Sequence, residues 1–134
     1  PYRRQRQMCI RDRFNMDMLD TQIRHRLFTA ELPVYTKVRD EMPARYGDNV
    51  TVVNSLVADG CIIEGTVENS VLARGVRIAP GAHVKNCIIM QDGQVHNDAS
   101  IENCILDKQT VIKRSARLIG PAAYPIVIAK NVVI

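Results

Sequence analysis

The sequence predicts an all-β fold, a three-sided parallel β-helix of about four coils, and two observations support this prediction. A six-residue phrase, aliphatic–x–Asn–Ser/Cys followed by two aliphatic residues, occurs four times, beginning at Val52, Val67, Val84 and Ile101. Across this region, aliphatic residues recur every five or six positions. That spacing fits neither the helical period of about 3.6 nor the strand period of about 2. It is the hexapeptide pattern, in which three short strands complete one turn.

Each recurring aliphatic residue is expected to point into the prism that the three strands enclose. A small residue often lies two positions earlier, and residues two apart on a strand face the same way. The narrow interior therefore accommodates one large and one small side chain per strand. The aliphatic residues expected inside are Val52, Val57, Ile62, Val67, Leu72, Ile78, Val84, Ile89, Val95, Ile101, Leu106, Ile112 and Leu118. The small residues expected beside them are Ser55, Gly60, Gly65, Ser70, Ala82, Cys87, Gly93, Ala99 and Cys104.

The asparagine of each phrase falls at the same corner of successive coils: Asn54, Asn69, Asn86 and Asn103. Asparagine tolerates left-handed backbone and bonds neighbouring backbone groups, which suits a tight turn. Because stacked strands lie about 4.8 Å apart, we expect these four side chains to form a structural ladder.

The chain divides into four segments. Residues 1–13 are expected to be a non-native or disordered extension, because "PYRRQRQMCIRDR" resembles translated adaptor sequence. Residues 14–49 do not follow the coil pattern and are interpreted as a connector, with helix-forming content over Asp17–Phe28. The β-helix is expected over 50–120. Residues 121–134 are rich in β-branched residues and form a predicted β tail that could pair with an exposed strand edge.

The net charge of +4 is concentrated in the first 13 residues, which hold five Arg and one acidic residue, Asp12. The rest of the chain has equal numbers of basic and acidic residues. The alternative is a basic arm for nucleic acid or a membrane surface, but we expect neither partner. No apolar run approaches the length of a membrane span, about 18 residues. The four cysteines lack metal-ligand spacing and no secretory signal is evident, so we expect reduced thiols, no metal site and a cytoplasmic location.

Motifs for catalysis are missing from the sequence: there is no phosphate-binding loop, nucleophile elbow or H-E-x-x-H helix. His25, His83 and His96 do not stack on one another at the predicted coil spacing. One alternative keeps His83 or His96 as the base of a hexapeptide acyltransferase, although the regular spacing leaves no room for the long loop that such an enzyme needs. We expect no catalytic residue in this chain.

Two arginines are candidates for anion binding. Arg74 and Arg77 lie in one stretch, "LARGVRI", and Arg77 stands between two inward-pointing residues, so its side chain points outward. An outward guanidinium can grip a phosphate with two hydrogen bonds. The alternative is that both are ordinary solvated surface residues.

Several stretches resemble the C-terminal part of glucose-1-phosphate adenylyltransferase, and "PVYTKVRDE" and "YPIVIAK" are most similar to its GlgD-type regulatory subunit. The resemblance extends over residues 14–134 and includes "FNMDMLD", "NSLVADGCIIEGTVENSVL" and "VKNCIIMQ". It implies a left-handed β-helix that supports oligomer contacts and lines a site for phosphorylated effectors. It also implies a nucleotidyltransferase domain, with Mg²⁺ and ATP, that has no counterpart here.

What the resemblance implies for this chain is a module of ADP-glucose formation in glycogen biosynthesis that is inactive alone and acts with a catalytic subunit in a hetero- or homo-oligomer. The stretch "SVLARGVRI" places Arg77 at the position of an activator-contacting arginine in catalytic relatives, whereas further arginines of those relatives are absent from "ASIENCIL". We therefore expect Arg77, with Arg74, to contact the phosphate of a sugar effector, and no cofactor in this chain. The remaining alternative is a purely structural oligomerisation module.

Overall fold

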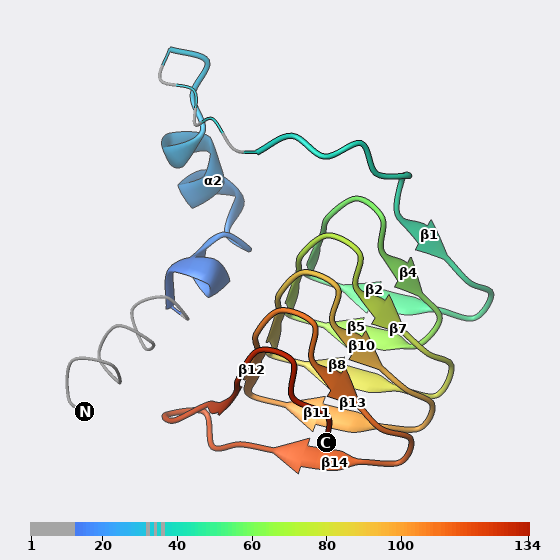
Figure 1. Ribbon diagram of the computed structural model, residues 1–134. Coiled ribbons are helices and arrows are strands. Elements are labelled where there is room, and N and C mark those ends of the chain that lie inside the picture. Colours follow the sequence, from blue (N-terminus) through green and yellow to red (C-terminus); the bar gives the residue numbers. More distant parts are fainter. Residues whose placement is uncertain (1–12, 32, 34, 36) are drawn as a thin grey trace.

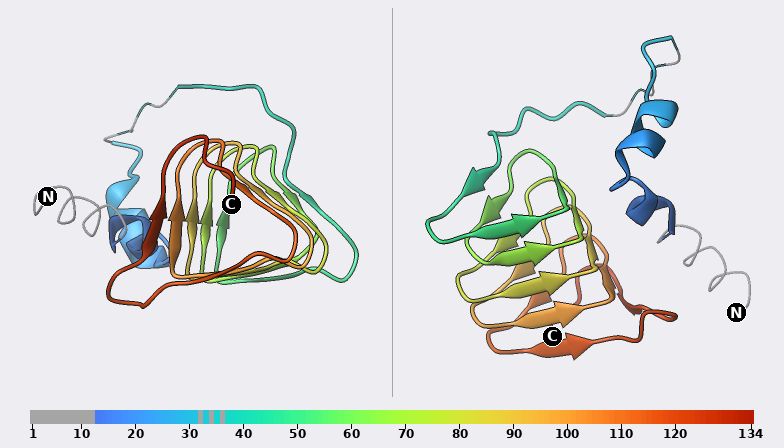
Figure 2. Two further views of the ribbon diagram at one scale, coloured as in Figure 1. Left: turned by 60° about the horizontal axis from the view of Figure 1, so that its bottom comes forward. Right: turned by 180° about the vertical axis from the view of Figure 1, so that it is seen from behind.

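Three parallel sheets wind around one interior in the computed structural model, which describes residues 13–31, 33, 35 and 37–134. Each sheet has five strands of two or three residues, stacked one coil above the next (Figure 1). Seen along the axis, the coils form a triangle, and the chain turns clockwise as it advances toward the reader, which is a left-handed path (Figure 2). The predicted three-sided parallel β-helix is confirmed.

The strands fall into three sets. Sheet A contains β1 (Arg45–Tyr46), β4 (Ile62–Ile63), β7 (Arg77–Ile78), β10 (Gln94–Val95) and β13 (Val111–Ile112). Sheet B contains β2 (Thr51–Val53), β5 (Thr66–Glu68), β8 (His83–Lys85), β11 (Ser100–Glu102) and β14 (Arg117–Ile119). Sheet C contains β3 (Leu56–Val57), β6 (Val71–Leu72), β9 (Ile88–Ile89), β12 (Cys104–Leu106) and β15 (Ile126–Ile128).

The register of sheet B shows why the sequence repeats. Val52 pairs with Val67, Val67 with Val84, Val84 with Ile101, and Ile101 with Leu118. The three central members of this column are almost completely buried. One aliphatic residue per strand therefore fills the prism, as the spacing predicts, and each stacks on its counterpart in the next coil.

Two predicted interior positions, Gly60 and Ile62, are wrong by one residue: Gly60 lies at the corner with a φ of 75°, and the buried residues are Cys61 and Ile63. Ile62 pairs with the outward-facing Arg77, whereas Ile63 pairs with Ile78 and is fully buried. The reason is a shorter corner in the 15-residue coil, where Gly65 lies directly against the next coil. A Cβ at Gly65 would meet the carbonyl oxygens of Ala82 at 2.5 Å and Ala79 at 2.8 Å. This coil is two residues shorter than the 17-residue coils that follow, and both residues are lost after Ile63 rather than spread evenly along the coil.

The outer face of sheet C is also apolar. Its outward column is Leu56, Val71, Ile88, Ile105 and Val127. Ile88 and Ile105 point away from the prism yet are buried, at 2% and 0% exposure. The N-terminal helical segment lies on this side of the column (Figures 1 and 2). Covering of the sheet explains how outward-facing isoleucines become inaccessible to solvent.

The segments on either side of the repeats extend the column. Strand β1 and the tail strand β15 add to sheets A and C, and Val133 forms an isolated bridge with Val111.

Helix α2 (Thr21–Leu27) is shorter than the predicted Asp17–Phe28, because Asp20 caps it by accepting a hydrogen bond from the Gln22 amide at 2.8 Å. Apart from Arg13, the extension expected over residues 1–13 lies outside the described residues.

Candidate functional site: a cationic groove at one corner

A groove of about 720 Å³ opens where sheets C and A meet at the corner of the column. Seven residues line it: Lys37, Arg39, Ala58, Ala73, Arg74, Gln91 and Lys108. Four of these side chains are basic and none is acidic. A concave surface lined by charge of one sign attracts ligands of the opposite sign, so the groove is suited to an anion.

One wall of the groove is a column built by the coil repeat. Arg74, Gln91 and Lys108 occupy the same corner in three consecutive coils, each 17 residues after the last. The backbone amide of Asp92 donates to the Arg74 carbonyl at 3.0 Å, and that of Gln109 donates to the Gln91 carbonyl at 2.9 Å. Two coil steps separate Arg74 from Lys108, which places their Cα atoms about 10 Å apart.

The corner keeps its shape through left-handed backbone. Gly75, Asp92 and Gln109 follow the three column residues and have φ angles of 72°, 59° and 58°. This conformation turns the chain sharply from sheet C to sheet A. The side chains of Arg74, Gln91 and Lys108 are thereby presented along one edge.

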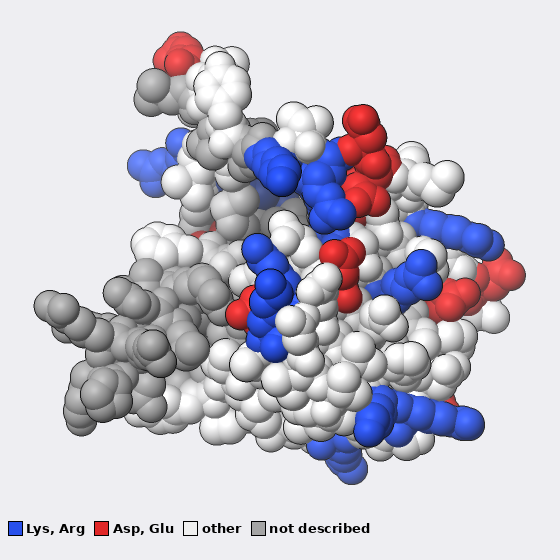
Figure 3. All heavy atoms as spheres, in the orientation of Figure 1, with Lys and Arg blue, Asp and Glu red and all other residues white. Residues whose placement is uncertain are grey.

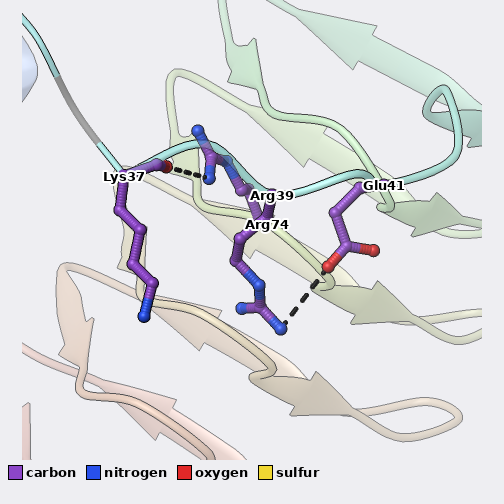
Figure 4. A network of polar contacts seen from close by, with 4 residues as sticks. All are labelled: Lys37, Arg39, Glu41 and Arg74. Atoms are coloured by element: carbon purple, nitrogen blue, oxygen red, sulfur yellow. Dashed lines mark hydrogen bonds and ion pairs between the residues drawn. The ribbon is translucent and has the colours of Figure 1, made fainter.

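The opposite wall is an extended segment, residues 37–42, which we call the strap. The Arg74 guanidinium donates from Nη1 to the Lys37 carbonyl oxygen at 2.9 Å, as Figure 4 shows. The Gly60 amide donates to the Met42 carbonyl at 2.6 Å. Within the strap, Arg39 Nη2 lies 3.5 Å from Glu41 Oε1. Basic side chains lie over the strap with acidic side chains beside them, and further basic side chains lie along the lower edge of this view (Figure 3).

The structure separates the two arginines that the sequence analysis grouped. Arg74 lines the groove, whereas Arg77 lies on the exposed outer face of sheet A, beside a cavity of about 320 Å³. Arg45, Glu64 and His96 also line that second cavity. Sequence reasoning missed Lys37, Arg39 and Lys108 as groove residues. The 17-residue step from Arg74 through Gln91 to Lys108 was a signal that could have revealed the last of them.

The histidines do not converge. His83 pairs with Ser100 on the outer face of sheet B, and His96 lies on the face of sheet A. In residues 13–31, 33, 35 and 37–134, no three His, Cys, Asp or Glu side chains gather as they would around a metal ion. Over the same residues, no helix has the length and apolar character needed to cross a membrane.

The four asparagines stack at the corner between sheets B and C, each with left-handed backbone at φ between 45° and 53°. The Asn54 amide donates to Asn69 Oδ1 at 2.8 Å, and the Asn69 amide donates to Asn86 Oδ1 at 2.6 Å. Asn103 instead donates to the Gly120 carbonyl at 2.9 Å. The ladder therefore joins three asparagines, whereas Asn103 bonds to the backbone where the chain leaves the column for the tail.

A second column, inside the prism beside the asparagines, consists of Ser55, Ser70, Cys87 and Cys104. The side chain of each donates to the carbonyl of the residue two positions earlier, at 2.8 to 3.2 Å. Interaction with the neighbouring Cys104 thiol raises the pKa of Cys87, and burial raises it further. Burial likewise raises the pKa of Cys61. These are free, buried cysteines whose thiols serve as small interior side chains.

These features define a hexapeptide-repeat β-helix with a basic corner groove. The chain belongs to the family described as GlmU-like, C-terminal hexapeptide, whose sequence model matches residues 40–122. It corresponds to the C-terminal hexapeptide region shared by GlgD and glucose-1-phosphate adenylyltransferase. The resemblance inferred from the sequence is thereby confirmed.

Curated relatives make the correspondence specific. Over 119 residues, or 89% of the chain, it is 42% identical to "Glycogen biosynthesis protein GlgD" of Bacillus subtilis (strain 168). It is 51% identical over 70 residues, 52% of the chain, to the protein of the same name from Geobacillus stearothermophilus. It is 33% identical over 105 residues, 78% of the chain, to "Glucose-1-phosphate adenylyltransferase" of Acetivibrio thermocellus. The chain spans 35%, 20% and 24% of the lengths of these relatives.

Proposed function

We propose that this chain is the regulatory and oligomerisation module of a GlgD-type subunit, and that it binds a phosphorylated sugar effector in the corner groove. The module acts with a catalytic subunit of glucose-1-phosphate adenylyltransferase in ADP-glucose formation for glycogen biosynthesis. The chain alone forms no ADP-glucose. The proposal places the module in the cytoplasm, where its thiols remain reduced.

The observation that carries the effector proposal is the set of four basic side chains in one groove with no acidic side chain among the lining residues. Phosphoryl oxygens accept several charge-assisted hydrogen bonds, and a guanidinium can give two to one phosphate. Arg74 and Lys108, about 10 Å apart by coil geometry, suit two phosphoryl groups at opposite ends of one hexose. We therefore assign the principal effector contact to Arg74 and Lys108 rather than to Arg77.

Calorimetric titration of the chain with fructose 1,6-bisphosphate tests this assignment. We expect saturable binding that Arg74→Gln and Lys108→Gln each weaken about tenfold, since tenfold corresponds to about 1.4 kcal/mol. Arg77→Gln is the matched control, because it removes a guanidinium from the same coil but outside the groove. Absence of binding to the unmodified chain, or an equal loss with Arg77→Gln, would overturn the assignment.

The partner and the lack of activity have separate tests. Light scattering of the chain with and without a catalytic subunit should show a larger particle in the mixture. A purely structural module would assemble in the same way but would not bind the bisphosphate. Incubation of the purified chain with ATP, Mg²⁺ and glucose 1-phosphate should give no ADP-glucose above the blank, and clear turnover would contradict the proposal.

A further inference from the structure

The two walls of the corner groove have different attachments to the fold. Arg74, Gln91 and Lys108 are fixed by hydrogen bonds between consecutive coils. Lys37 and Arg39 belong to the strap, which is extended and exposed along residues 37–40. The complete set of four basic side chains therefore exists only while the strap lies against the column.

Few contacts hold the strap in this position. From the column, the Arg74 side chain donates a hydrogen bond to the strap backbone, at the Lys37 carbonyl. The second attachment is the bond from the Gly60 amide to the Met42 carbonyl. Glu41 lies over the same glycine, because a Cβ at Gly60 would be 3.0 Å from Glu41 Oε2. Segments with few buried contacts and exposed backbone open at low free-energy cost.

We propose that effector binding and docking of the strap are one coupled equilibrium, in which an anion in the groove holds residues 37–42 against the corner of the β-helix. This inference rests on the proposed function of the same groove. An anion that contacts Lys37 and Arg39 on one side and Arg74 and Lys108 on the other binds the docked state better than the undocked state. A ligand with such a preference must shift the equilibrium toward the docked state.

The consequence is a regulatory device within the fold. The strap connects the helical N-terminal segment to β1 (Figure 1). An anion at the corner thus changes the freedom of the chain that leads away from the column, and no strand of the β-helix has to move. By the same linkage, a change that loosens the strap weakens binding of the anion, even when every basic side chain is retained.

Limited trypsin digestion of the unmodified chain tests the coupling directly, because trypsin cleaves after Lys37 and Arg39 in the strap. Saturating fructose 1,6-bisphosphate should slow cleavage at these two sites about fivefold or more, the lower end of typical coupling. Cleavage after Arg26 in helix α2, outside the groove, should not change and serves as the internal control. Equal rates at Lys37 and Arg39 with and without bound ligand would overturn the coupling.

A pair of glycine variants tests the reverse direction. Gly60 and Gly81 both have left-handed backbone, with φ of 75° and 77°, but only Gly60 adjoins the strap. Gly60→Ala should weaken fructose 1,6-bisphosphate binding about fivefold or more, although it removes no basic side chain. Gly81→Ala, in which the added Cβ meets Asp98 at another corner, should bind as the unmodified chain does.

The results separate the two proposals. Normal binding by the unmodified chain, with unchanged strap cleavage and equal affinities for the two alanine variants, would overturn the coupling and leave the groove as a binding site. Failure of the unmodified chain to bind would overturn both. Since the digestion uses the unmodified chain, it decides the question even if Gly60→Ala does not fold.

Discussion

Arg74 donates a hydrogen bond to the backbone carbonyl of Lys37, and this contact joins residues 37 positions apart across the corner groove. It connects the repeating part of the chain to the part that does not repeat. The carbonyl occupies one of the five N–H groups of the guanidinium, so Arg74 can hold the strap and still contact an anion. The site therefore depends on both parts of the chain.

The register correction at β4 predicts different costs for two neighbouring isoleucines. Ile63→Ala removes a fully buried side chain and should lower the free energy of unfolding by about 2–5 kcal/mol. Ile62→Ala removes a half-buried side chain on the outer face and should cost about 1 kcal/mol or less. Urea unfolding of the two variants measures both values. A larger cost for Ile62→Ala would contradict the register of β4 and favour an inward Ile62.

The shortened corner predicts strong intolerance at Gly65. An added Cβ would lie 2.5 Å from the Ala82 carbonyl oxygen and 2.8 Å from that of Ala79, and these backbone atoms cannot move without disturbing the next coil. Gly65→Ala should cost more than about 2 kcal/mol, in the range of overpacked sites. Gly47→Ala is the control, because its nearest contact, at 3.2 Å, is the flexible Glu64 side chain. Thermal unfolding that ranks the two variants equally would contradict this account of the corner.

The asparagine ladder predicts that backbone and side chain contribute separately at Asn86. Asn86→Ala loses the bond from Asn69 and forces alanine into left-handed backbone, so we expect a cost of about 2 kcal/mol. Asn86→Gly loses the same bond but relieves the backbone, and its cost should be about 1 kcal/mol. Chemical denaturation compares the two. Glycine and alanine variants of equal stability would mean that the left-handed φ carries no cost here.

Burial of Cys61 predicts a loss of stability in alkali. Its pKa is raised from the ordinary value of 9.0 because burial disfavours the thiolate. The raised pKa contributes stability that is complete below pH 9 and is lost as the pH rises above 9, because the unfolded chain then ionises more readily. The slope reaches at most about 1.4 kcal/mol per pH unit for one thiol.

Cys61→Ser tests this dependence, since a hydroxyl can replace the thiol's bond to the Ala73 carbonyl but does not ionise in this range. Denaturation midpoints at pH 7 should be similar for the two proteins. Between pH 9 and about 10.5 the unmodified chain should lose stability more steeply. Parallel curves would indicate that ionisation of Cys61 does not affect folding.

The sequence was sufficient to predict the fold because the interior of the column requires one aliphatic residue every five or six positions. Val67, Val84 and Ile101 stack as their spacing indicates. The error at Ile62 arose where a coil of 15 residues can lose its two residues at any corner, and only the packing against Gly65 reveals which corner. The buried outer residues Ile88 and Ile105 were missed because the hexapeptide period describes the interior and not what covers a sheet from outside.

The candidate site was predictable only in part. The local stretch around Arg74 makes that residue a candidate, and the 17-residue coil step from Arg74 predicts that Lys108 lies at the same corner. Lys37 and Arg39 share no period with the coils, so their position depends on the path of the strap across the corner. The resemblance implies an effector contact for Arg77, but the chain turns from the corner onto sheet A between Arg74 and Arg77, so the two arginines line different cavities.

The most direct test of the central claim is a crystal structure of the chain with fructose 1,6-bisphosphate. Phosphate density between Arg74 and Lys108, with Lys37 and Arg39 closing the groove from the strap, is the predicted result. Phosphate bound instead on the face of sheet A beside Arg77, with the corner groove empty at saturating ligand, would contradict it.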